Sequence, residues 1–215
     1  MLEKAEDFQS ALQALLHDTF AAHQRIIFNG NGYTEDWIAE AEKRGLCNFP
    51  STAEALPAYI AQKNVDLFVK HGIYTPDEVQ ARYEIHAENY AAVTSIEAKT
   101  MADMIRRQIL PAVSAFGAEL CERMGKKQQM NLSCGYETET AKAVSALTEE
   151  LYAACGQLEA DIAGIPADAT EAMGYCHKNL VPGMAKARKA ADELEELVPQ
   201  TYWPMPDYCE LLFDL

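Results

Sequence analysis

The feature that most constrains the fold is a set of apolar residues that recur every three or four positions across residues 75–198. This spacing gathers apolar side chains on one face of a helix, and that face must pack against a partner. Three long helices are expected, over residues 75–125, 138–163 and 168–198. No region shows the alternation of several strands. We predict a mainly α fold: a long-helix up-and-down bundle with a smaller irregular N-terminal part and an aromatic C-terminal tail.

Local signals mark the helix ends. Ser51 with Glu54, and Thr75 with Glu78, each match a capping box, in which the hydroxyl and the carboxylate satisfy free backbone N–H groups. A helix is also expected over residues 3–24, without a clear capping residue at its start.

Proline positions predict where the long helices deviate from regular geometry. Pro111 removes one internal hydrogen bond, so a kink or break is expected near residues 108–110. Pro182 and Gly183 predict a second bend. Residues 125–137 are polar and are expected to form the connector that reverses the chain.

We divide the chain into three segments, which we expect to form one structural domain. Residues 1–74 are the N-terminal helical and turn segment, residues 75–200 the long-helix bundle, and residues 201–215 a docking tail.

A double Asn-Gly sequence separates an extended segment from a predicted helix near the N-terminus. Asn and Gly tolerate positive φ, so this turn could reverse the chain or present several N–H groups to an anion. A structural connector is the more common use of such a turn. No Walker or Rossmann glycine pattern accompanies it, and a calcium loop would need other residues at two of its positions. The weak anion-binding candidates are Asn29, Gly30, Asn31 and Gly32.

Composition excludes several classes of partner. The 215-residue chain carries a formal net charge of −15, which repels nucleic acid and anionic lipid surfaces. No apolar run approaches the length needed to span a bilayer, and the N-terminus does not resemble a signal peptide. We therefore predict a cytoplasmic protein that binds neither nucleic acid nor membrane.

The six cysteines and five histidines do not form a recognisable site. The cysteines lack Cys-x-x-Cys spacing, so we expect neither zinc nor disulfides. No histidine follows a glutamate by three residues, which argues against a carboxylate di-metal bundle. His177 lies on an apolar stripe, where a hydrogen-bonded core residue is more common than a ligand. We predict no metal site and no catalytic residue in this chain.

Aromatic side chains mark possible contact surfaces. The tail cannot be regular helix around its two prolines, yet it is densely apolar and must bury against something. Docking on its own bundle is the simpler interpretation, and docking on another subunit or domain is the alternative. The possible interface residues are Tyr33, Trp37, Tyr202, Trp203, Tyr208 and Phe213.

An independent catalytic pocket would need convergent polar side chains. The best candidates are Asn29, Asn31, Arg82, Glu84 and His86. The last three are more simply explained as the polar surface of a helix.

Five separated segments, in matching order, resemble the C-terminal region of type III glutamine synthetases. They are RIIFNGNGYTEDWIAEAEKRGLCNFP (25–50), RYEIHAENYAAVTSIEAKTM (82–101), ILPAV (109–113), ADELEELV (191–198) and YWPMPDYCELLF (202–213). The resemblance covers nearly the whole chain.

The resemblance implies a parent enzyme, a multi-subunit ring, that ligates ammonia to glutamate with ATP and magnesium or manganese. None of that family's catalytic motifs has a matching position here. We therefore expect a piece of a longer polypeptide that is inactive alone and binds no cofactor itself. Its expected partners are the catalytic domain and neighbouring subunits of a homo-oligomer, and its expected roles are subunit assembly or active-site positioning. The alternative is a stand-alone helical interaction or regulatory module.

Overall fold

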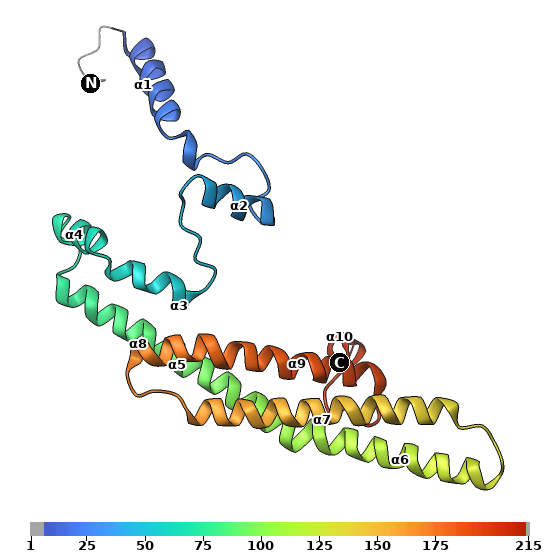
Figure 1. The fold of residues 1–215 in the computed structure, drawn as a ribbon. Coiled ribbons are helices and arrows are strands. Elements are labelled where there is room, and N and C mark those ends of the chain that lie inside the picture. The colour runs from blue at the N-terminus through green and yellow to red at the C-terminus, as the bar shows by residue number, and fades with distance from the viewer. Residues whose placement is uncertain (1–6, 214–215) are drawn as a thin grey trace. The chain divides into compact units, whose positions relative to one another are not determined.

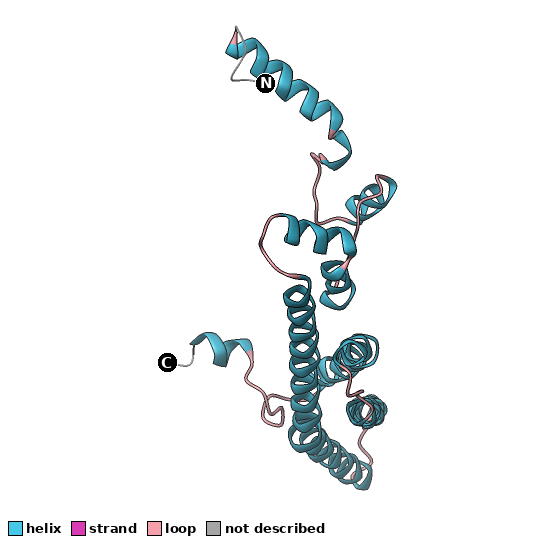
Figure 2. Cartoon of the chain, turned by 90° about the vertical axis from the view of Figure 1, so that its left-hand side faces the viewer, coloured by secondary structure: helices cyan, strands magenta, loops and turns pink. Residues whose placement is uncertain are grey.

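The computed structural model describes residues 7–213, with the side chain of Tyr208 excepted. Every regular element in this range is helical, and none is a strand (Figure 2). The predicted mainly α class is therefore confirmed. The chain forms two compact units, Met1–Glu54 and Ala55–Leu215. The finer division at residues 74 and 200 stays a prediction.

The Ala55–Leu215 unit contains the long helices. They run up and down, with α6 beside α7 and α7 beside α9 (Figure 1). Helix α8 packs on α5. The elements of the bundle are α5 (Pro76–Met104), η4 (Ile105–Ile109), α6 (Leu110–Gln129), α7 (Gly135–Ala163), α8 (Ala169–Tyr175), η5 (Cys176–Leu180) and α9 (Val181–Leu197).

Two π-helical turns interrupt the long helices where the prolines predicted deviations. In η4, Leu110 N–H donates to the carbonyl of Ile105, five residues back, directly before Pro111. In η5, Val181 N–H donates to Cys176 in the same way, directly before Pro182. A proline lacks the N–H of an ordinary helical bond and its ring crowds the preceding turn, so a wider turn accommodates it. The sequence thus located both irregularities correctly.

Helix ends follow the capping signals. Thr75 Oγ1 accepts from Glu78 N–H, and the Glu78 carboxylate accepts from Thr75 N–H at 2.8 Å, which completes the predicted capping box. Ser51 Oγ likewise accepts from Glu54 N–H. The reversing connector is shorter than expected, because α6 continues to Gln129 and α7 already begins at Gly135.

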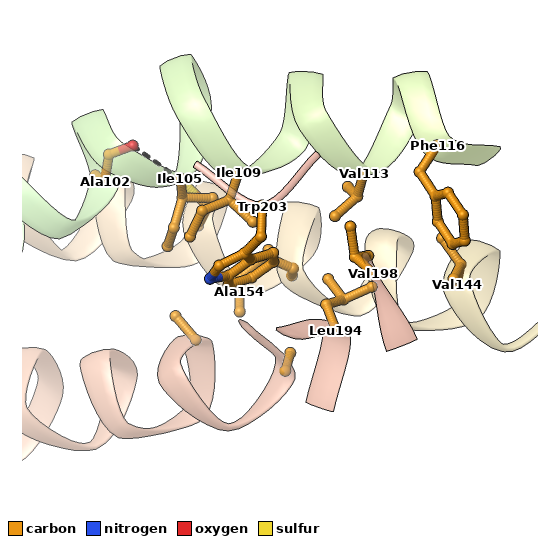
Figure 3. Close-up of a cluster of buried hydrophobic side chains, with 14 of the residues drawn as sticks. Ala102, Ile105, Ile109, Val113, Phe116, Val144, Ala154, Leu194, Val198 and Trp203 are labelled. Atoms are coloured by element: carbon orange, nitrogen blue, oxygen red, sulfur yellow. Dashed lines mark hydrogen bonds between the residues drawn. The ribbon is translucent and has the colours of Figure 1, made fainter. Parts of the chain in front are cut away.

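The main core joins η4, α6, α7, α9 and the tail. Figure 3 shows Trp203 beside Ile105 and Ile109, with Val113 and Leu194 nearby. Its buried residues are Ala102, Ile105, Ile109, Val113, Phe116, Leu120, Val144, Leu151, Ala154, Cys155, Ala187, Ala190, Leu194, Val198 and Trp203. A second cluster, centred on Leu158 and Leu180, fills the space between α5, α7 and α8. The predicted apolar stripes of the long helices are therefore the ones that the bundle buries.

Shorter helices precede the bundle. In the Ala55–Leu215 unit, η3 (Leu56–Ile60) and α4 (Gln62–Lys70) pack on α5. Helix α3 (Thr52–Ala55) comes directly before them in the chain.

The Met1–Glu54 unit contains α1 (Phe8–Ala22), η2 (Gln24–Ile26) and α2 (Glu35–Lys43). The expectation of an uncapped helix over residues 3–24 was wrong at its start. Asp7 is the N-cap of α1, and its carboxylate accepts from the N–H groups of Gln9 and Ser10. That hydrogen bonding holds the pKa of Asp7 below its ordinary value, with the Ser10 hydroxyl as the largest cause.

Candidate functional site

The Asn-Gly turn does not adopt the left-handed backbone on which its anion-binding interpretation depended. Among the described non-glycine residues only Asn131 has positive φ, and the positive-φ glycines are Gly45 and Gly72. A Cβ on Gly30 would lie 2.4 Å from the Phe28 ring. A larger residue at position 30 would therefore require the Phe28 ring to shift. Anion binding at Asn29, Gly30, Asn31 and Gly32 stays an untested prediction.

Asn31 organises the start of α2. Its Oδ1 accepts from Tyr33 N–H at 3.0 Å, and its carbonyl accepts from Thr34 Oγ1 at 3.0 Å. Such side-chain bonds to nearby backbone groups are the usual way in which Asn fixes a turn. In this structure Asn31 therefore acts as a connector residue.

Arg44 ties the extended segment to α2. Its Nη1 donates to the carbonyl of Ile27, and its Nε donates to Glu40 at 2.6 Å. The hydrogen bond from Arg44 lowers the pKa of Glu40 below its ordinary value. The guanidinium also lies over the Phe28 ring, which packs on Trp37 with ring centroids 4.3 Å apart. These contacts make a small aromatic cluster in the Met1–Glu54 unit.

The two aromatic interface candidates of this unit differ in exposure. Trp37 is half-buried against Phe28, whereas Tyr33 is 100% exposed. Tyr33 is thus fully available for a contact with another surface.

The aromatic tail divides into a buried and an exposed part. Trp203 is 6% exposed and belongs to the main core. Tyr202 packs on Phe116, and its hydroxyl donates to Glu119. That hydrogen bond lowers the pKa of Glu119 and raises the pKa of Tyr202. The first half of the tail therefore docks on its own bundle.

The second half of the tail forms the short helix α10 (Tyr208–Phe213). Leu211, Leu212 and Phe213 on this helix are exposed. Tyr208 begins α10, and its side chain lies outside the described part of the structure. The exposed leucines and phenylalanine are available to a further contact surface.

The polar residues of the hypothetical catalytic pocket have ordinary structural surroundings. Arg82 lies over the Tyr74 ring at 4.4 Å, and Glu84 accepts from Gln80 at 2.9 Å. Both of these residues and His86 are exposed on α5. Asn29 and Asn31 belong to the other unit.

Thiols and possible metal ligands are dispersed. All six cysteines are free. Burial raises the pKa values of Cys155 and Cys176, so neither thiol has the character of an activated nucleophile. Within the described residues, no three His, Cys, Asp or Glu side chains gather closely enough to hold a metal ion. His177 is half-buried, with Nδ1 3.4 Å from the Tyr90 hydroxyl oxygen.

An apolar groove in the Ala55–Leu215 unit was not predicted from the sequence. It has a volume of about 520 Å³ and lies among α5, η4, α9 and the loop that follows α9. Its lining residues are Ile96, Glu97, Thr100, Met101, Met104, Ile105, Ile109, Ala187, Arg188, Ala191, Asp192, Glu195, Trp203 and Met205. The detectable signal was a second apolar stripe on α5, at Ile85, Val93 and Ile96, separate from the buried one.

Helix α1 presents another uncovered apolar face. None of its residues is buried. Its largest exposed apolar side chains are Phe8, Leu15, Leu16 and Phe20, and Phe20 is 61% exposed. Their spacing puts them on one stripe, which in a folded protein is normally covered.

Over the described residues, no helix combines the length and apolar content that crossing a bilayer requires.

Comparison with known proteins gives a consistent result. A family model described as the glutamine synthetase C-terminal domain matches residues 11–128. A glutamine synthetase of Butyrivibrio fibrisolvens is 35% identical over 98% of this chain and 31% of its own length. A type-3 glutamine synthetase of Dictyostelium discoideum is 33% identical over 98% of this chain and 30% of its own length. A glutamine synthetase of Bacteroides fragilis is 26% identical over 99% of this chain and 30% of its own length.

The chain thus spans just under a third of the length of these relatives. The predicted resemblance is confirmed by the family match, and its type III character is supported by the Dictyostelium relative. On these findings, together with the helical fold, the chain belongs to the glutamine synthetase C-terminal domain family.

Proposed function

We propose that this chain is a non-catalytic helical domain of a type III glutamine synthetase, which supports subunit assembly or the positioning of active-site elements. The parent reaction would be the ATP-dependent ligation of ammonia to glutamate. Its partners would be the catalytic domain and neighbouring subunits of a homo-oligomer in the cytoplasm. The six free cysteines are compatible with such a reducing compartment.

The described residues do not fit the ATP and divalent metal of the parent reaction. Among the residues that the structure describes, acidic side chains do not gather into a metal-binding group. Several basic side chains are already paired, including Arg106 with Glu159 at 2.7 Å and Arg107 with Asp103 at 2.7 Å. We therefore assign no step of the ligation to this chain.

The observation that carries the assembly role is the uncovered apolar face of α1. A helix of 15 residues that buries none of its side chains gains little from its own unit. Exposed stripes of Phe and Leu are typical of surfaces that contact another protein. The catalytic domain and a neighbouring subunit are the surfaces that the family relationship offers.

The test uses the full-length synthetase. The double variant Leu16→Asp and Phe20→Asp places charges on the apolar face of α1, and the double variant Ala14→Asp and Ala21→Asp is the matched control on the opposite face of the same helix. Light scattering coupled to size exclusion gives the assembly size, and glutamine formation gives the activity. We expect the double variant to assemble incompletely or to lose activity, and the control to behave like the natural enzyme. Unchanged assembly and activity in the double variant would refute the proposal.

A further inference from the structure

The groove beside Trp203 has the character of a binding surface. Its volume of about 520 Å³ lies within the range of about 300–1,000 Å³ that is common for ligand sites. Its floor includes Met101, Met104 and Met205, whose flexible side chains adapt to varied apolar partners. Trp203 and Ile105 form a firm base, because both belong to the main core (Figure 3).

One polar atom at the groove has no partner. Trp203 lines the groove, and its Nε1 is buried without a hydrogen-bond acceptor among the described residues. A buried N–H group is normally paired, since leaving it unpaired is costly. Because this atom is fully buried, it belongs to the core beneath the groove and is not a contact point for an occupant.

The apolar surface extends beyond the groove along α5. Ile85, Val93 and Ile96 are exposed on the same side of the helix as Met104. From Ile85 to Met104 the stripe runs about 29 Å along the helix axis. A small molecule would cover the groove and leave Ile85 and Val93 exposed, so an elongated occupant fits better.

The charges beside this surface are mainly acidic. Glu97 on α5 and Glu195 on α9 line the groove, and neither has an ion-pair partner within the described residues. Asp192 is paired with Arg188 at 3.3 Å. An occupant with basic residues beside its apolar face would therefore complement the groove.

We infer that the groove and the α5 stripe bind an amphipathic helix of a partner protein, with lysines or arginines flanking its apolar face. This is the helix-in-groove mode of recognition, in which apolar anchors spaced three and four residues apart enter an apolar channel. The surface lies wholly within the Ala55–Leu215 unit and is separate from α1, so the inference does not depend on the assembly role.

The binding test reads the fluorescence of Trp203 in a Trp37→Phe background, where Trp203 is the remaining tryptophan of the sequence. The probe is an amphipathic helical peptide of about 18 residues with a leucine stripe and lysine flanks, which spans about 27 Å. The matched probe has glutamate in place of every lysine. We expect saturable binding of the lysine peptide. Its affinity should exceed that of the glutamate peptide by about threefold to tenfold. Equal affinities, or no saturable binding, would overturn the inference.

Variants locate the bound peptide. Ile96→Ser in the groove and Ile85→Ser beyond it should each weaken binding, whereas Leu132→Ser, at an equally exposed position on the turn between α6 and α7, should not. If Ile85→Ser leaves the affinity unchanged, the elongated helix is refuted in favour of a groove-sized ligand.

A further variant tests the charges. The double variant Glu97→Lys and Glu195→Lys should reverse the preference between the two peptides, and the double variant Glu139→Lys and Glu150→Lys on α7 is its charge control. A preference that survives the double charge reversal would contradict the electrostatic part of the inference.

Discussion

The two units of the chain use helices in opposite ways. In the Ala55–Leu215 unit, α5, α6, α7 and α9 each bury apolar residues in the two clusters of the bundle. In the described part of the Met1–Glu54 unit, the buried apolar residue is Ala41, and α1 buries none. The first kind of helix is stabilised by tertiary packing, and the second by its cap and local contacts. The difference is the reason why α1 is proposed above as a contact surface.

The two tryptophans give the largest expected contrast between the units. Trp203→Ala should lower the free energy of unfolding of the Ala55–Leu215 unit by about 3–5 kcal/mol, because it removes a large buried side chain from the main core. Trp37→Ala removes a half-buried ring that packs on Phe28, and should change that main transition by less than about 0.5 kcal/mol. Urea unfolding followed by circular dichroism measures both. Equal effects would mean that the units unfold as one.

A matched pair of leucines sharpens the same comparison without changing an aromatic residue. Leu151→Ala on α7 should destabilise the bundle by about 2–5 kcal/mol, because Leu151 is fully buried. Leu16→Ala on α1 should cost less than about 0.5 kcal/mol in the isolated chain. The thermal unfolding midpoints of the two variants, each compared with that of the natural chain, measure the two effects. A large loss for Leu16→Ala would show that α1 is already packed within this chain.

Glu137 offers a pH-dependent test within the bundle. Its carboxylate accepts from Lys127 Nζ at 2.6 Å, and this hydrogen bond holds the pKa of Glu137 below its ordinary value. Because the folded-state pKa is the lower one, the stabilisation is present above the unfolded-state pKa and is lost as pH falls through the folded-state value. Glu137→Gln should therefore be less stable than the natural chain at pH 7.

The difference in the free energy of unfolding between the natural chain and Glu137→Gln should shrink as acid protonates Glu137, below roughly pH 4.5. Urea unfolding at several pH values measures it. A constant difference across the range would show that the ion pair is not its source. The effect should be smaller than that of Leu151→Ala, since Lys127 is partly exposed.

Helix caps give the smallest expected effects. Thr75→Ala removes the cap of α5 and should lower the stability of the bundle by about 1 kcal/mol. Asp7→Ala removes the cap of α1 and should reduce helicity locally, with no shift of the main unfolding transition. Amide hydrogen exchange resolves the two outcomes by segment. Faster exchange throughout the bundle in Asp7→Ala would contradict the separation of the units.

Much of the fold was predictable because its signals are local. Pro111 and Pro182 located both π-helical turns, and Thr75 with Glu78 located the start of α5. The connector after α6 was predicted too long, because the polar residues Lys126 and Lys127 belong to α6, where Lys126 pairs with Glu122 and Lys127 with Glu137 of α7. The start of α1 was also misjudged, because Asp7 was not recognised as a cap.

The candidate surfaces were less predictable. Sequence patterns singled out Trp203 and Phe213 together as apolar tail residues, yet one is buried and the other is 76% exposed. The Asn-Gly turn suggested positive φ, but Phe28 packing over Gly30 explains the glycine at that position. The groove combines residues of α5 and α9, about 90 positions apart in the sequence, so no local pattern could reveal it.

The sequence by itself determined the helical class, the positions of the long helices, their proline-induced irregularities and the family. These properties depend on periodicity, caps and backbone restrictions within a few residues. Only the tertiary structure decided which aromatic residues are buried, that Trp203 Nε1 lacks a partner, and that α5 and α9 enclose an apolar groove. Burial depends on which distant segments meet, and the free energy of that packing is not encoded in the pattern of any single helix.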